Sequence, residues 1–323
     1  MTHDQVMIRV DHLSKSYGGP HGKTAVDDIS FEVRRGEVLG FLGPNGAGKT
    51  TTMKILTSFL APTSGRAEIA GHNVYDDSLE ARRRIGYLPE DTPLYKDMTV
   101  LEYLDFVADV RGLSPTARRP RLRRVVEQCG IGDRLGMHIG ELSKGYRQRV
   151  GLSQAILHEP EVLILDEPTS GLDPNQIAEI RTVIKQIGEE KTVIFSTHIL
   201  GEVQATCSRV LIISDGKLVA DGTPDELSRG TGGQQILVEL RTSQVEQALT
   251  MIRLIDGIAD ASQLSGGETP RLRITAKAGA DPRGDIARVL ATADGVDLLQ
   301  LSNEKANLED VFRKLTSREG AAS

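Results

Sequence analysis

The residues best suited to chemistry form a glycine-rich stretch that follows the apolar residues 38–42. In such a loop, successive backbone N–H groups surround a phosphate, and the following helix directs its positive end at the same anion. We therefore predict that Lys49 reaches the β- and γ-phosphates of a nucleotide and that Thr50 binds Mg²⁺. The stretch fits the pattern G-x-x-x-x-G-K-[ST] at every fixed position and consists of Gly43, Pro44, Asn45, Gly46, Ala47, Gly48, Lys49 and Thr50.

Two acidic residues, Asp166 and Glu167, end the apolar run at residues 162–165. A continuous apolar run of this kind is typical of a strand in the middle of a parallel sheet. Carboxylates at the end of such a strand are costly to bury unless they have a function. In a phosphate-loop protein, Asp166 would hold Mg²⁺ through its water shell, and Glu167 would act as the base for the attacking water. A structural role for the pair is the alternative.

Three further candidates lie where other elements begin or end. Ser143 is placed as the N-cap of a helix, and Ser143-x-Gly145 offers a hydroxyl, free amides and a positive dipole end to a γ-phosphate. An ordinary capped helix would have the same sequence. Asp173 is a second predicted N-cap, before a proline at the first helical position. His198 follows the predicted strand 192–196 and can reach the γ-phosphate, with a structural histidine as the alternative.

Two more candidates lie in predicted turns. Tyr17 begins the turn-rich stretch 17–20, and it is either a flat platform for an adenine ring or a turn tyrosine packed on the sheet. Glu90 follows the predicted strand 85–88 and lies either near the metal and the attacking water or in a solvated loop. For Tyr17 and for Glu90, the position alone does not decide between the two alternatives.

Composition narrows the class of protein. The chain has 323 residues, 39% of them hydrophobic and 26% charged, and this length favours two domains. The net charge of −6 argues against a nucleic-acid binder with a strongly basic face. No apolar run approaches the roughly 20 residues that span a bilayer, and the first residues do not resemble a signal peptide. With only two cysteines, the sequence predicts a cytoplasmic protein.

The first domain is expected over residues 1–228, with a helical insertion at 92–140 that extends to about 158 when the helix after Ser143 is included. Thr99 and Glu102 form a capping box that starts this insertion. Its second half is rich in arginine, which indicates either a surface for an anionic membrane or acidic partner, or a solvated helix face. These arginines are Arg118, Arg119, Arg121, Arg123 and Arg124.

The flexible run 229–233 is the predicted domain boundary. The second domain, residues 229–323, has the predicted order βαββαβ, which resembles a ferredoxin-like α+β unit. Residues 264–267, Leu-Ser-Gly-Gly, imitate a nucleotide signature, but they lie between two predicted strands and are expected to form a hairpin turn.

Taken together and in this order, the phosphate loop, Ser143-x-Gly145, Asp166-Glu167, Ser170-x-x-Asp173 and His198 resemble the ATP-binding subunit of an ABC transporter. The resemblance covers about residues 4–228. It implies an α/β phosphate-loop cassette, with a mixed-sheet core, an antiparallel β subdomain and a helical subdomain.

The resemblance also implies ATP and Mg²⁺ as cofactors, held in a nucleotide sandwich of two copies or of this chain and a related cassette. The phosphate loop and Thr51 of one copy would face Ser143, Gly145 and Asp173 of the other. Tyr17 would then stack on adenine. Lys49, Glu167 and His198 would be the catalytic residues. Thr50, Asp166 and Glu90 would lie at the metal.

The C-terminal extension and its close at residues 307–312 look like the subgroup that serves ABC-2-type exporters, including gliding-motility-type ATP-binding subunits. We therefore predict an ATPase that drives a separate ABC-2-type membrane permease from the inner face of the plasma membrane, with no nucleic-acid partner. A soluble ABC-type ATPase acting on ribosomes or DNA is the alternative. Two departures from the family pattern are Glu90, where glutamine is usual, and the signature Leu-Ser-Lys-Gly-Tyr, which places Lys144 and Tyr146 at its variable points.

Overall fold

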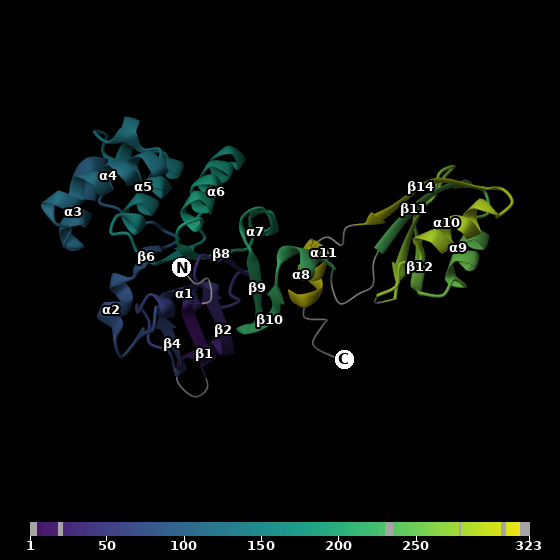
Figure 1. Cartoon of the computed structure of the whole chain (residues 1–323), viewed down its shortest axis with the longest axis horizontal. Helices are drawn as coiled ribbons and strands as arrows, with labels where there is room; N and C mark the ends of the chain where they lie inside the picture. The colour runs from purple at the N-terminus through teal and green to yellow at the C-terminus, as the bar shows by residue number, and fades with distance from the viewer. Residues whose placement is uncertain (1–4, 19–21, 230–234, 278, 305–307, 317–323) are drawn as a thin grey trace. The chain divides into compact units, whose positions relative to one another are not determined.

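The computed structural model describes residues 5–18, 22–229, 235–277, 279–304 and 308–316. The chain forms two compact units, Met1–Pro224 and Asp225–Ser323, which are described separately (Figure 1). The domain boundary expected after residue 228 stays a prediction. Parts of the stretches 17–20, 229–233 and 307–312, which carried predictions above, lie outside the described residues.

The first unit is built on a six-stranded sheet in the order β10-β9-β3-β8-β7-β6. All neighbouring pairs are parallel except β9 and β10, which form a hairpin. Leu42 lies opposite Thr197 and Asp166 opposite Ser196, so the ends of three central strands meet at one edge of the sheet. The strands are β3 (Val38–Leu42), β6 (Ile85–Leu88), β7 (Val162–Asp166), β8 (Thr192–Thr197), β9 (Arg209–Ser214) and β10 (Lys217–Gly222).

A second, antiparallel sheet has the order β2-β1-β4-β5. The residue pattern alone indicates only short strands at residues 6–10 and 29–33, but the first two strands of this sheet are 12 residues long each. His12 and Asp28 have φ angles of 49° and 52°, and the register shifts around them interrupt the alternation of side chains while the ladder continues. The strands are β1 (Val6–Tyr17), β2 (Lys23–Arg34), β4 (Ser64–Ile69) and β5 (His72–Asn73).

Helices cover the central sheet on both faces. Alternate residues of β7 divide between two hydrophobic clusters: Ile164 packs with α1 and the antiparallel sheet, and Leu165 packs with α3–α6. Helix α1 ends at Leu56, because Ser58 adopts a left-handed φ of 60° that cannot continue the helix. The helices are α1 (Lys49–Leu56), α2 (Ser78–Arg83), α3 (Val100–Val110), α4 (Pro115–Cys129), α5 (Lys144–Ile156), α6 (Pro174–Gly188) and α7 (Leu200–Thr206).

Helices α3, α4 and α5 gather into one group, which Figure 1 shows in blue and teal. The predicted capping box starts this group, since the Thr99 side chain accepts from the Glu102 amide and the Glu102 side chain accepts from the Thr99 amide. Within the described ranges, no helix is both long enough and apolar enough to cross a membrane.

The second unit contains an antiparallel sheet in the order β12-β13-β11-β14. Its elements follow the expected order βαββαβ. Residues 264–267 were expected to form a hairpin turn, but Leu264 and Ser265 belong to β12, and the connection to the antiparallel β13 begins at Gly266. The ferredoxin-like assignment stays a prediction. The elements are α8 (Pro224–Arg229), which begins at the boundary, β11 (Gln235–Thr242), α9 (Val245–Arg253), β12 (Ile258–Ser265), β13 (Arg271–Ala276), α10 (Arg283–Ala291), β14 (Val296–Glu304) and α11 (Leu308–Thr316).

Candidate active site

The glycine-rich loop runs from the end of β3 to the start of α1, as the sequence predicts. Gly48 is the N-cap of α1 and has a φ of 110°, and a Cβ at this position would lie 2.3 Å from the carbonyl oxygen of Ala25. A side chain is therefore excluded there by both space and backbone conformation. No side chain caps α1 and its first turn carries no acidic residue. Its first amides and positive dipole end thus suit an anion.

Lys49 joins this loop to the acidic residues of β7. It is buried, and its Nζ donates to the carbonyl oxygens of Gly43 at 2.8 Å and Pro44 at 3.3 Å. The same Nζ forms an ion pair with Glu167 Oε1 at 3.2 Å. The structure therefore brings together the lysine and the glutamate that the sequence places 118 positions apart.

Asp166 lies at the end of β7, where two hydroxyl groups reach its carboxylate. Ser196 Oγ donates to Asp166 Oδ1 at 2.6 Å and Thr50 Oγ1 at 3.2 Å. Burial raises the pKa of Asp166 above its ordinary value. The two hydrogen bonds act in the opposite direction and offset only part of this shift. The hydroxyl of Thr50 and the carboxylate of Asp166 provide adjacent oxygen donors, which fit a Mg²⁺ ion that keeps several waters. Among the described residues, no group of three or more acidic, histidine or cysteine side chains forms a complete metal cage.

Glu167 has an unusual backbone conformation. Its φ is 47°, in the left-handed region that residues with a side chain rarely adopt. Its amide donates to Ser196 Oγ at 2.9 Å, and its Oε2 lies 2.9 Å from His198 Nδ1. The Glu167 carboxylate is buried, but the His198 side chain is 45% exposed. Glu167 therefore lies between a buried lysine and an accessible imidazole.

Comparisons with known proteins agree with this geometry. A family model described as "ABC transporter" matches residues 26–170. The linearmycin resistance ATP-binding protein LnrL of Bacillus subtilis (strain 168) is 34% identical over 315 residues, which cover 97% of this chain and 99% of that protein. The bacitracin transport ATP-binding protein BcrA of Bacillus licheniformis is 34% identical, with 96% and 97% covered. The chain belongs to the ATP-binding subunits of ABC transporters.

Solved structures show the same cassette. A structure described as the ATP binding subunit of an ABC transporter is 32% identical, with a TM-score of 0.63 and coverage of 69% of this chain and 92% of that one. The ATP-binding cassette MJ0796, solved as a dimer in a post-hydrolysis state with ADP and Pi, is 25% identical, with a TM-score of 0.62 and coverage of 68% and 99%. The chain is thus an ATPase subunit of a transporter, and the alternative of an ATPase acting on ribosomes or DNA is not favoured.

The signature segment begins α5 in this cassette. Ser143 is the predicted N-cap, and its Oγ accepts from the Tyr146 amide at 3.4 Å. Gly145 lies against α6, since a Cβ there would be 2.8 Å from Gln176 Cδ. The side chain of Lys144 is exposed and runs beside Gly171 of the same copy. No hydrogen bond or ion pair of the described chain joins Ser143 to the phosphate loop of the same copy.

Asp173 is also the N-cap that the sequence predicts. Its Oδ1 accepts from the amides of Asn175 and Gln176, both at 3.0 Å. Within the described residues Asp173 makes no contact of this kind with the phosphate loop either. Neither Ser143 nor Asp173 therefore has a hydrogen bond or ion pair to the phosphate loop of the same copy among the described residues.

Tyr17 and Glu90 lie in different environments. The Tyr17 hydroxyl lies 3.4 Å from Thr51 Oγ1 on α1, so Tyr17 stands beside the phosphate loop. The residue is 45% exposed, and Lys15 Nζ lies over its ring at 5.6 Å from the centroid. Glu90 is exposed and makes no hydrogen bond or ion pair with any described residue. No hydrogen bond or ion pair among the described residues joins Glu90 to Thr50 or Asp166, and its place at the metal stays a prediction.

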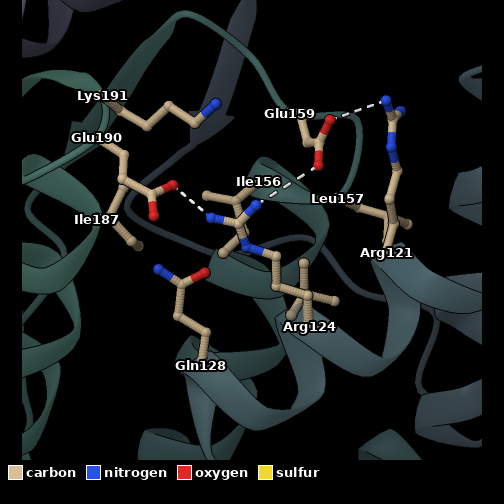
Figure 2. A pocket seen from close by; sticks show the side chains of 10 residues that line it. Arg121, Arg124, Gln128, Ile156, Leu157, Glu159, Ile187, Glu190 and Lys191 are labelled. Atoms are coloured by element: carbon tan, nitrogen blue, oxygen red, sulfur yellow. Dashed lines mark hydrogen bonds and ion pairs between the residues drawn. The ribbon is translucent and has the colours of Figure 1, made fainter.

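The arginine-rich helix α4 is largely neutralised by nearby acids. Arg118 pairs with Asp109, Arg121 with Glu159 at 2.9 Å, and Arg124 with Glu159 and Glu190. Figure 2 shows Arg124 between these two glutamates, with Arg121 reaching Glu159 from the other side. These pairs fasten α4 to the ends of α5 and α6 and favour the solvated helix face over a free basic surface. The remaining members of the cluster, Arg119 and Arg123, are exposed.

Sequence reasoning missed Ser196, whose hydroxyl contacts both Asp166 and the Glu167 amide. The available signal was a serine at the end of a buried strand, where a polar side chain needs a partner. It also missed Thr92 and Gln148, which are 56 positions apart and joined by a hydrogen bond of 2.7 Å. No spacing in the sequence indicates such a contact.

Proposed function

We propose that the chain binds ATP with Mg²⁺ and hydrolyses it in a sandwich of two cassettes that powers a separate ABC-2-type permease. The observation that supports this most strongly is the arrangement of Lys49, Glu167 and His198 beside the Thr50–Asp166 pair. A phosphate-binding lysine, a metal-binding oxygen pair and a base lie at the edge where the central strands end. This is the set of groups that phosphoryl transfer to water requires.

Each residue has one role in this proposal. Lys49 and the amides at the start of α1 bind the β- and γ-phosphates, and Tyr17 stacks on adenine. Thr50 and Asp166 hold Mg²⁺, which would neutralise charge on the phosphates, and Glu90 lies near it. Glu167 accepts the proton of the attacking water. His198 donates from its exposed side to the γ-phosphate while its Nδ1 orients Glu167.

The sandwich is supported by two helix caps, Ser143 and Asp173, that make no hydrogen bond or ion pair with the phosphate loop of their own copy among the described residues. Ser143 and Gly145 start a helix whose first turn carries no acidic residue, and Asp173 begins the neighbouring helix. We assign Ser143 and Gly145 to the γ-phosphate held by the other cassette, with Asp173 facing the phosphate loop of that cassette. The dimeric structure of MJ0796 supports this assignment, because that protein is solved as a pair of cassettes.

The partner and cargo are inferred from relatives. LnrL is described as a resistance protein for linearmycin and BcrA as a transport protein for bacitracin, and both match nearly the full length of this chain. For this chain we propose export of a small antibiotic-like molecule through an ABC-2-type permease. The cassette would work at the cytoplasmic face of the membrane that holds this permease.

The variant Glu167→Gln tests the assignment of the base. An amide cannot take a proton from water, so turnover should fall by about a hundredfold or more while ATP still binds. Hydrolysis of ATP and the dimer fraction by size-exclusion chromatography measure the two effects, and the variant should accumulate ATP-bound dimers. Glu246→Gln, an exposed change in α9, is the control. Near-normal hydrolysis by Glu167→Gln would contradict the proposal.

A further inference from the structure

Glu202 in α7 is a buried carboxylate to which none of these roles applies. Its exposed fraction is 1%, and it accepts hydrogen bonds from the hydroxyls of Thr169 and, at 2.6 Å, Thr197. No lysine, arginine or histidine of the described ranges forms an ion pair with it. A buried carboxylate is costly, and these two hydroxyls are the donors that offset the cost.

The two threonines belong to the two segments that carry the catalytic groups. Thr169 lies two residues after Glu167, and Thr197 directly precedes His198. Thr197 is tied further to the phosphate loop, because its carbonyl oxygen accepts from the Gly43 amide at 3.3 Å. Glu202 therefore connects the segment after β7 to the segment after β8, and through Thr197 to the loop that binds phosphate.

We propose that Glu202 is a positioning residue for ATP hydrolysis, which holds Glu167 and His198 together through Thr169 and Thr197. The inference rests on the proposed role of Glu167 as the base. Glu167 has a left-handed backbone conformation, and such a conformation persists only where surrounding contacts fix it. The bond from Thr169 to Glu202 restrains the chain just after this strained residue. The bond from Thr197 restrains the residue next to His198, whose Nδ1 lies 2.9 Å from Glu167 Oε2.

A matched pair of variants tests the link in the full-length chain. Thr169→Val removes the hydroxyl at nearly constant volume, and Thr169→Ser keeps it. We expect the kcat of Thr169→Val to fall by roughly tenfold or more, because small displacements of a catalytic group have effects of this size. Thr169→Ser should stay within about threefold of the wild type, since its hydroxyl can still reach Glu202. The KM for ATP should change little in both, because the phosphate loop and Lys49 keep their contacts.

The second test uses Glu202→Ala alone and with Thr169→Val. If the two side chains act through one bond, the double variant is no slower than Glu202→Ala. Thermal unfolding is recorded for every variant, and if Glu202→Ala does not fold, the Thr169 pair decides the question. The inference is overturned by a wild-type kcat in Thr169→Val, by an equal loss in Thr169→Ser, or by a fall in kcat matched by lost ATP affinity.

Wild type and Glu167→Gln are measured in the same assay to separate two kinds of failure. If the wild type does not hydrolyse ATP, or if Glu167→Gln hydrolyses it normally, the proposed function fails. If the wild type is active, Glu167→Gln is inactive and Thr169→Val matches the wild type, only the role of Glu202 is wrong.

Discussion

Ser196, near the end of β8, determines where the carboxylates of Asp166 and Glu167 lie at the end of β7. Ser196 donates to Asp166 and accepts from the Glu167 amide, so one hydroxyl serves both neighbours. The alternation of side chains along a strand would direct these two acids to opposite faces. The left-handed φ of Glu167 ends that alternation and lets both carboxylates lie at one site. The left-handed conformation of Glu167 thus places its carboxylate beside that of Asp166.

His158, just after α5, is a residue whose charge depends on folding. Its Nε2 lies 2.9 Å from the carbonyl oxygen of Ile85, and its buried Nδ1 has no partner. Burial, with a smaller contribution from Arg111, lowers its pKa from 6.5 to about 4. The folded protein therefore binds this proton less strongly than the unfolded chain does.

Acid should consequently destabilise the cassette through His158. Stability from the neutral imidazole is complete above the unfolded pKa of 6.5 and is lost as the pH falls toward about 4. Between about pH 7 and pH 5, the free energy of unfolding should drop by about 2 kcal/mol through this residue. Urea unfolding of wild type and His158→Gln at both pH values measures the effect. An equal drop in the variant, which has no group titrating there, would contradict the assignment.

At the scale of elements, α5 is fastened to the segment that follows β6. Thr92 donates to Gln148 Oε1 at 2.7 Å and Gln154 donates to the Tyr87 carbonyl oxygen at 2.9 Å. Between these bonds lies Gly151, where a Cβ would be 2.4 Å from Thr92 Cγ2. Thr92 also has a φ of 41°, which is unusual for a β-branched residue. The segment with Glu90 and the helix that begins after Ser143 therefore form one packed element.

Gly151→Ala should disrupt this packing. The added methyl group would overlap both Thr92 and Leu88, so we expect the free energy of unfolding to fall by about 1–3 kcal/mol. Gly201→Ala in α7 is the control, because no atom lies within 4 Å of its Cβ position, and it should raise stability by about 0.5–1 kcal/mol. Denaturant midpoints measure both. Two variants with the same sign of change would show that the close approach at Gly151 is unimportant.

The sequence predicts the strands, helices and caps of this cassette better than the contacts between them. The phosphate loop, the acids of β7 and the caps at Ser143 and Asp173 follow local rules of spacing and residue type. The lengths of β1 and β2 do not follow such rules. Bulges at His12 interrupt the alternation of apolar and polar side chains, so a local pattern cannot show that the strands continue. The bond between Thr169 and Glu202 joins residues 33 positions apart and depends on how two strand ends are packed.

At the scale of the whole molecule, the site belongs to one unit. All of its hydrogen bonds and ion pairs given above join residues of Met1–Pro224. The second unit, Asp225–Ser323, has its own buried cluster, formed by both helices and the sheet of its βαββαβ arrangement. The two units therefore have separate cores, and a role of the second unit in regulating the ATPase is open to direct test.

A chain shortened to residues 1–229 should bind ATP as the full chain does. The truncation leaves every residue of the proposed site and its core in place, so the dissociation constant should change by less than about threefold. Calorimetric titration with ATP measures it, and circular dichroism shows that the shortened chain is folded. A folded truncated protein that no longer binds ATP would show that the second unit contributes to the site.

Because α5 is bonded to the segment around Thr92 through Gln148 and Gln154, a movement of this segment would also move the N-terminal end of the helix. The contacts from Gln148 to Gln154 hold about 9 Å of its length, and an arm of about 7 Å extends from Gln148 to Ser143. For a helix that moves with this segment as one rigid body, a tilt of about 10° in the segment around Thr92 would move Ser143 by about 1 Å. That distance is enough to make or break a hydrogen bond at Ser143.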